Sequence, residues 1–123
     1  MILSPVFCND FFYVGVTKEI SIELDATLNE LPDAIRKSIL TVISSFERNE
    51  RTVIAAAFIK KINNERSKND FRMMSASNRH IIKTAKKTAA IFKTLRAKHI
   101  STKPSKLISL FYRHYNKYDI PKV

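Results

Sequence analysis

Hydrophobic and polar residues follow two different periods along this chain, and the period changes near residue 25. Residues 11–16 form a run rich in phenylalanine, tyrosine and valine, and residues 19–24 alternate strictly between polar and apolar side chains. Alternation with period two is typical of a β-strand with one buried face. The pattern therefore predicts a short N-terminal β element, a strand or hairpin, within residues 1–24.

Beyond that point the apolar positions recur every three or four residues, as on the buried face of an α-helix. Asp25 is a candidate N-cap for a short turn over residues 26–31, and Pro32 suits the first position of the next helix. The stripe over residues 31–46 predicts an amphipathic helix. Residues 53–59 are apolar almost all round, which predicts the most buried helix of a bundle.

The C-terminal part predicts two more helices. Residues 63–70 are polar and unpatterned, which indicates a linker. A long helix is expected over about residues 77–99, with Ile81 and Phe92 on its apolar side. A last helix should begin near Pro104.

Together these elements predict a mainly α fold, a single-domain bundle of about four helices with a short N-terminal β-strand or hairpin. A chain of 123 residues is long enough for one hydrophobic core and short for two. The expected parts of the single domain, residues 1–123, are the β element at 1–24, a near-neutral helical core at 25–70, a basic helical half at 71–118 and a tail at 119–123.

Glycine and cysteine are scarce, and this excludes several classes of site. Gly15 is the one glycine of the chain, so phosphate-cradling glycine loops and glycine-based hairpin turns are absent from the sequence. Cys8 is the one cysteine, which excludes an intramolecular disulfide and favours an intracellular protein. Uncharged runs fall short of the ~20 residues that span a bilayer, and the first nine residues lack a basic signal region. We expect a soluble cytoplasmic or nucleoid-associated protein without membrane contact.

The net charge of +11 is confined to the C-terminal half. Up to Asp70 the chain holds nine basic and ten acidic residues, whereas residues 71–118 hold twelve basic residues and no carboxylate. Lysines and arginines in such a segment repel one another and find no ion-pair partner within it. A surface kept for solubility mixes both signs, so a polyanionic partner is the favoured interpretation.

On a helical wheel of the long helix, five cations fall opposite Ile81, which predicts one packed face and one basic face; they are Arg79, Lys83, Lys86, Lys87 and Lys93. DNA is the expected partner, ahead of RNA, and the sequence-predicted nucleic-acid-binding residues are Arg79, Lys83, Lys86, Lys87, Lys93, Arg96, Lys98, Thr102, Lys103, Lys106 and Arg113.

Residues 95–111 could form a helix-turn-helix, with the start of the second helix in the major groove. The turn lacks glycine, and the bulky Leu95 stands where a small residue would ease helix crossing. A ribbon-helix-helix is less favoured, because Glu19 and Glu23 on the strand would be repelled by phosphates. RNA binding stays open, since Tyr118 beside Lys117 could stack on unpaired bases.

The sequence gives no sign of catalysis. His80, His99 and His114 lie far apart and have no acidic neighbour to orient them, and no metal-binding spacing, nucleophile motif or cofactor motif occurs. The expected function is a non-enzymatic nucleic-acid-binding protein, most simply a small DNA-binding transcription regulator with no cofactor. It could act as a homodimer through its near-neutral half. The alternative is an adaptor or inhibitor that docks its basic face on an acidic protein.

Overall fold

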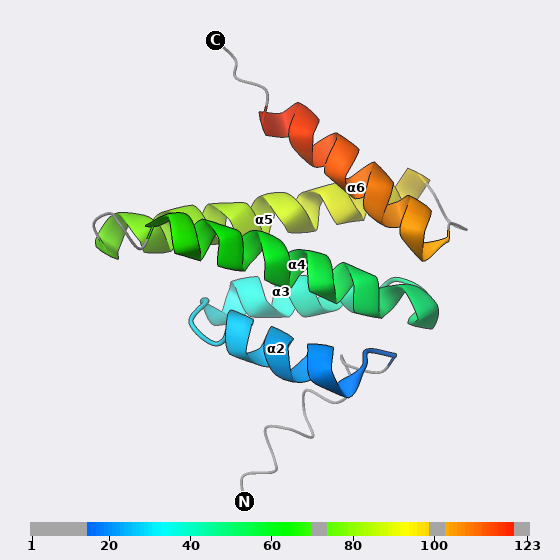
Figure 1. Cartoon of the computed structure of the whole chain (residues 1–123), viewed down its shortest axis with the longest axis horizontal. Helices are drawn as coiled ribbons and strands as arrows, with labels where there is room; N and C mark the ends of the chain where they lie inside the picture. The colour runs from blue at the N-terminus through cyan, green and yellow to red at the C-terminus, as the bar shows by residue number, and fades with distance from the viewer. Residues whose placement is uncertain (1–14, 70–73, 99–102, 120–123) are drawn as a thin grey trace, which may run out of the picture.

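A computed structural model describes residues 15–69, 74–98 and 103–119. These residues form helices and connecting turns, with no β-strand among them, so the prediction of a mainly α fold is confirmed. The structure describes five helices, one more than the predicted four: α2 (Lys18–Leu28), α3 (Asp33–Ser44), α4 (Arg48–Asn69), α5 (Met74–Lys98) and α6 (Pro104–Asp119). In Figure 1 α4 and α5 run side by side, α2 and α3 lie below them, and α6 crosses α5 obliquely. Within the described part of the chain, no helix is both long and apolar enough to cross a membrane.

The predicted strand over residues 19–24 is wrong, because this segment forms most of α2. The Thr17 hydroxyl oxygen accepts a hydrogen bond from the Ile20 amide at 3.4 Å and so caps the helix. Leu24 and Leu28 are buried, and Ile20 is partly buried against the hydrophobic core, whereas Ile22 is 63% exposed. The spacing of four residues from Ile20 to Leu24 and Leu28 therefore decides the secondary structure of this segment, and the period-two alternation does not. Asp25 lies inside this helix instead of capping a new one, and residues 1–14 lie outside the described residues.

The predicted helix over residues 31–46 is confirmed by α3, although Pro32 precedes the helix as its N-cap instead of occupying its first position. Arg36 pairs with Asp33 in its first turn. Leu31 and Phe46, just outside the two ends, are both buried. The apolar stripe thus continues into the flanking turns and anchors both of them on the core.

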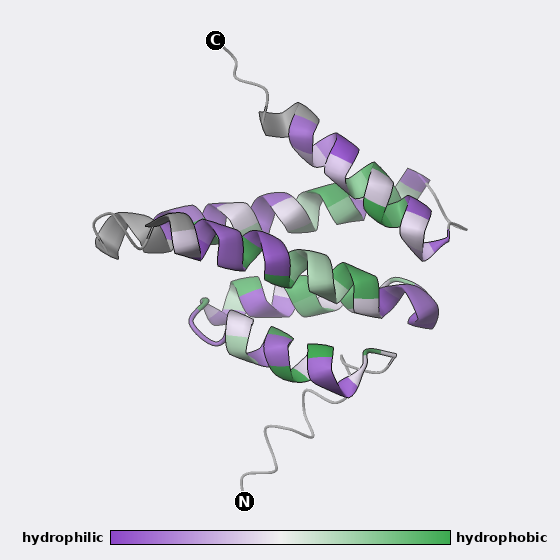
Figure 2. Cartoon of the chain, in the orientation of Figure 1, coloured by the Kyte–Doolittle hydropathy of each residue, from purple (hydrophilic) through white to green (hydrophobic). Residues whose placement is uncertain are grey.

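The predicted linker over residues 63–70 is wrong up to residue 69, because α4 continues through this polar stretch. Figure 2 shows that α4 begins with a hydrophilic turn, is hydrophobic in its middle and is mostly hydrophilic over its second half. Arg66 holds the polar part: one guanidinium nitrogen donates to the Thr27 carbonyl oxygen at 3.1 Å and another to the Asn63 side-chain oxygen at 2.8 Å. The guanidinium also lies 3.7 Å from a Glu30 carboxylate oxygen. Contacts with α2 and its C-terminal turn therefore support the end of α4.

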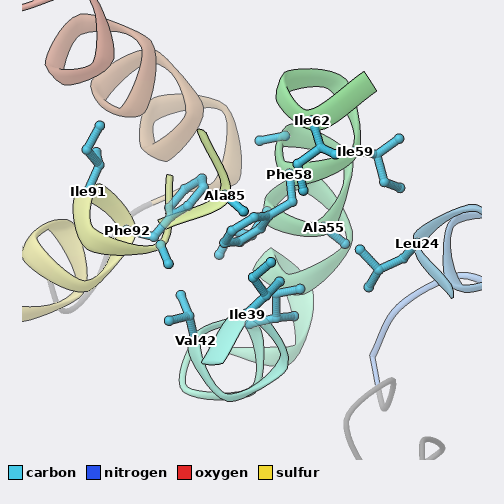
Figure 3. Close-up of a cluster of buried hydrophobic side chains, with 14 of the residues drawn as sticks. Leu24, Ile39, Val42, Ala55, Phe58, Ile59, Ile62, Ala85, Ile91 and Phe92 are labelled. Carbon is cyan, nitrogen blue, oxygen red and sulfur yellow. The ribbon is translucent and has the colours of Figure 1, made fainter. Parts of the chain in front are cut away.

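Phenylalanine rings from four parts of the chain meet in the centre of the core. Phe92 of α5 lies against Phe58 of α4 at 5.5 Å between ring centroids, and both side chains are fully buried (Figure 3). Phe111 of α6 stacks on Phe92 at 4.4 Å with an interplanar angle of 3°, and Phe46 meets Phe92 edge-on at 6.0 Å. Phe92 thus joins α4, α5, α6 and the α3–α4 turn. All described helices share one hydrophobic cluster.

Gly15 has a backbone requirement that other residues meet poorly. Its φ is +90°, and a Cβ atom added there would lie 3.0 Å from the Arg48 carbonyl oxygen and 3.2 Å from the Arg48 Cα. The Gly15 carbonyl oxygen also accepts a hydrogen bond from the Thr52 hydroxyl at 3.2 Å. This turn therefore fixes the start of α2 against the start of α4.

Replacing Gly15 with alanine is expected to lower the free energy of unfolding by about 1–3 kcal/mol, because the new side chain strains the backbone and meets backbone atoms that cannot rotate away. Urea unfolding followed by circular dichroism measures the effect. Alanine at Ser109, an exposed position inside α6, is the control and should change stability by less than about 0.5 kcal/mol. Equal stability of the two variants would contradict the assignment.

Candidate nucleic-acid interface

Helix α5 packs against three other described helices and keeps one face exposed to solvent. It contacts α3, α4 and α6. The apolar residues that the sequence placed on its inner face are buried, which confirms the predicted packing; they are Ile81, Ala85, Thr88, Phe92 and Leu95. Thr88 meets its hydrogen-bonding need locally, since its hydroxyl donates to the Thr84 carbonyl oxygen at 2.9 Å. The buried and exposed faces are therefore cleanly separated.

The open side of α5 carries four exposed cations, here called the α5 ridge: Arg79, Lys83, Lys86 and Lys93. At 100° per residue they occupy an arc of about 80°, and at 1.5 Å per residue they extend over about 21 Å of the helix axis. Among the described residues no salt bridge reaches any of the four. The ridge is a row of like charges that face solvent.

The three remaining predicted cations of α5 have different surroundings. Lys87 is half-buried, and its Nζ lies 3.9 Å from the centroid of the Tyr115 ring. The Arg96 Nε donates to the Ser45 carbonyl oxygen at 2.8 Å, and its guanidinium carbon lies 6.0 Å from the Phe46 ring centroid. These contacts tie α5 to the α3–α4 turn, so Arg96 supports the fold. Lys98 is exposed at the end of the helix.

The predicted residues of the last helix are exposed near α5. Lys103 directly precedes α6, and Lys106 and Arg113 lie on its outer side. The stacked Phe92 and Phe111 rings hold α6 against α5. Thr102, and with it the turn of the predicted helix-turn-helix, lies outside the described residues. The exposed cations of the described C-terminal helices are therefore the α5 ridge and Lys98 on α5, with Lys103, Lys106 and Arg113 in the α6 region.

A pocket of about 270 Å³ opens between α4, α5 and α6, beside the ridge. It is lined by Lys61, Asn64, Glu65, His80, Lys83, Thr84, Lys87 and Tyr115. The sequence-based selection of binding residues omitted the residues that α4 and α6 contribute to this pocket; these are Lys61, Asn64, Glu65 and Tyr115. Lys61, Asn64 and Glu65 are three and four residues apart. If residues 63–70 had been predicted as helix, this spacing would have placed the three side chains on one face of it.

Two tyrosines of α6 hold lysines of neighbouring helices. The Lys61 Nζ lies 3.8 Å from the Tyr115 ring centroid and 5.2 Å from that of Tyr112, and the Lys60 Nζ lies 5.7 Å from that of Tyr112. An ammonium group above an aromatic face is attracted by the ring quadrupole. Tyr115 is only 8% exposed and Tyr112 is half-buried, so these rings position cations. The side chain of Tyr118 lies outside the described residues.

Acidic residues gather far from the α5 ridge. Glu19, Glu23, Asp25 and Glu30 are exposed along α2 and the turn that follows it. Helix α2 packs on α4, and α3 and α4 separate it from α5 and α6 in Figure 1. These four carboxylates therefore lie at the opposite side of the bundle from α5 and its ridge.

The histidines are dispersed. His80 is exposed on α5, His114 is half-buried on α6 and His99 lies outside the described residues. The part of the chain that the structure describes brings no three histidine, cysteine or carboxylate side chains together as a metal site.

Comparisons with protein-family models, with curated proteins and with solved structures found no match to this chain.

Proposed function

We propose that this protein is a non-enzymatic nucleic-acid-binding protein that acts as a small DNA-binding regulator. The main support for this proposal is the α5 ridge. Its four cations are exposed on the face of α5 that does not pack against the other described helices. Lys103, Lys106 and Arg113 of the α6 region are exposed as well and supply three further cations for the proposed contact with DNA. Lysines and arginines that neutralise phosphates release condensed counterions, and this release drives binding.

Duplex DNA is favoured over single-stranded RNA as the partner. Proteins that bind unpaired bases stack them on exposed aromatic rings. Tyr112 and Tyr115 are turned towards Lys60, Lys61 and Lys87 and are at most half-exposed. A surface of cations without described exposed aromatic rings fits a phosphate backbone best.

The start of α6 is the best candidate for contact with base edges. Lys103, Ser105 and Lys106 are exposed there, whereas Leu107 is fully buried and anchors the first turn of α6 on the core. In a helix-turn-helix the N-terminal residues of the second helix reach into the major groove. Thr102 belongs to the same predicted group.

A salt titration tests this function. If the four ridge cations and the three cations of the α6 region each meet a phosphate of duplex DNA, the slope of log K against log salt concentration should be about −6. Affinity should then fall by about 10³–10⁴-fold between 50 and 200 mM salt. Single-stranded DNA and RNA of matched length serve as comparisons. A slope near −1, with weak binding to all three polymers, would point to an acidic protein partner instead.

A further inference from the structure

The pocket between α4, α5 and α6 has walls suited to one anionic group. Its cationic walls come from two helices, with Lys61 on α4 and Lys83 and Lys87 on α5. The Asn64 amide and the His80 imidazole supply further hydrogen-bond donors. The tertiary fold brings these lysines of different helices together. The basic composition of residues 71–118 does not predict this, because Lys61 lies outside that segment.

Tyr115 keeps two of these lysines in place. Its ring is 8% exposed, and the Nζ atoms of Lys61 and Lys87 lie 3.8 and 3.9 Å from its centroid. The two ammonium groups are therefore at most about 8 Å apart, within one Debye length at physiological ionic strength. The ring lowers the entropic cost of positioning them beforehand.

The formal charge of the pocket matches a dianion. Lys61, Lys83 and Lys87 contribute three positive charges, and the Glu65 carboxylate offsets one of them. A phosphate monoester carries about −1.5 to −2 charges at neutral pH and offers three terminal oxygens as acceptors. A backbone phosphodiester carries one charge and has fewer free oxygens. The pocket is thus better matched to a monoester than to an internal phosphate of a strand.

The size of the pocket supports the same ligand class. A volume of about 270 Å³ is below the ~300–1,000 Å³ typical of sites for drug-sized ligands. Its concave shape between three helices also differs from the convex ridge of α5, which a duplex can approach from outside.

We propose that this pocket binds a phosphate monoester, with Lys61, Lys83 and Lys87 on the phosphate oxygens. This inference goes beyond the proposed function, because binding of polymer phosphates on the ridge does not require it. Only Lys83 belongs to both surfaces, whereas Lys61 belongs to the pocket alone.

Calorimetric titration of the full chain with adenosine monophosphate and with adenosine tests the proposal. Adenosine monophosphate is expected to bind at least about tenfold more tightly than the uncharged nucleoside, since charge-assisted hydrogen bonds are the strong ones. Equal affinity for the two ligands, or no binding of either, would overturn the proposal. Either result leaves the salt-dependent binding of duplex DNA by the ridge unaffected.

Two variants with opposite expected effects assign the binding to this pocket. Lys61→Gln should weaken the affinity for adenosine monophosphate about tenfold, whereas Glu65→Gln should strengthen it severalfold because it removes the competing carboxylate. Lys37→Gln, at an exposed position of α3, is the control that changes net charge alone. Thermal unfolding checks that each variant is folded. Equal effects of Lys61→Gln and Lys37→Gln, or weaker binding by Glu65→Gln, would count against the site.

A second comparison identifies the source of the monoester. A short single-stranded oligonucleotide with a 5′-phosphate is titrated against the same strand with a 5′-hydroxyl. A preference for the phosphorylated strand that Lys61→Gln abolishes would support the proposal, with strand ends as the ligand. Discrimination of adenosine monophosphate alone would also support it, with a free nucleotide as the ligand.

Discussion

Replacing Lys83, Lys86 and Lys93 together with glutamine should weaken the binding of duplex DNA by about 500-fold at 0.1 M salt. Each neutralised phosphate contributes about 0.9 to the slope of log K against log salt concentration. At 0.1 M salt, one such contact therefore raises the binding constant roughly eightfold above its value at 1 M salt. The slope itself should become less steep by about 3. Fluorescence anisotropy over a series of salt concentrations measures both quantities. All three side chains are exposed, so stability should change little.

A matched control separates the position of the charges from their number. Glutamine at Lys18, Lys37 and Arg48 removes the same three charges from exposed positions of α2, α3 and α4. This variant should retain nearly the full salt slope, because those cations lie away from the ridge. If both triple variants lose binding to the same extent, overall charge governs the interaction and the ridge is not the interface.

Truncating Phe92 to alanine is expected to have the largest effect on folding, about 3–5 kcal/mol of unfolding free energy. Phe92 is fully buried and touches the rings of Phe46, Phe58 and Phe111, so its loss leaves a cavity where several elements meet. Small domains have only about 5–15 kcal/mol of stability in total. Urea denaturation should therefore show a strongly lowered midpoint.

Ile22→Ala provides the comparison for that experiment. Ile22 is also large and apolar, but it is 63% exposed, and its truncation should cost less than about 0.5 kcal/mol. A loss below about 1 kcal/mol for Phe92→Ala would mean that the ring cluster does not hold α6 on α5.

The helices with a single clear period could be predicted from the sequence. Residues 31–46 and the start near Pro104 satisfy only the helical spacing, and α3 and α6 form there. The segment around Ile22 satisfies two periods at once, because Ile20 and Leu24 fit both an alternating strand and one side of a helix. The hydroxyl cap of Thr17 and the continuation of the stripe to Leu28 favour the helix.

The end of α4 could not be predicted from local pattern. Its last turns contain few apolar residues, and Arg66 finds its partners at Thr27 and Glu30 of the α2 region, far away in the sequence. The buried Ile62 was the one local sign that the helix continues. Propensity and periodicity do not contain such distant contacts.

The candidate site was predictable to the extent that it lies on one helix. The wheel of α5 correctly separates the buried Ile81 face from the exposed lysines. The different surroundings of Arg96 and the pocket around Lys61 depend on how α3, α4 and α6 pack on α5. The role of the exposed α5 lysines in nucleic-acid binding stays a prediction.

The close packing of α5 against three other helices has a mechanical consequence for any polymer bound to it. The backbone hydrogen bonds of α5 fix the distance between the Cα atoms of Arg79 and Lys93, and its packing around Phe92 resists bending of the helix. The protein would thus offer its charges at fixed intervals along a stiff rod, and the DNA would have to bend, widen or twist to meet them. Preference among DNA sequences would then reflect how cheaply each one deforms, even at base pairs that no side chain touches.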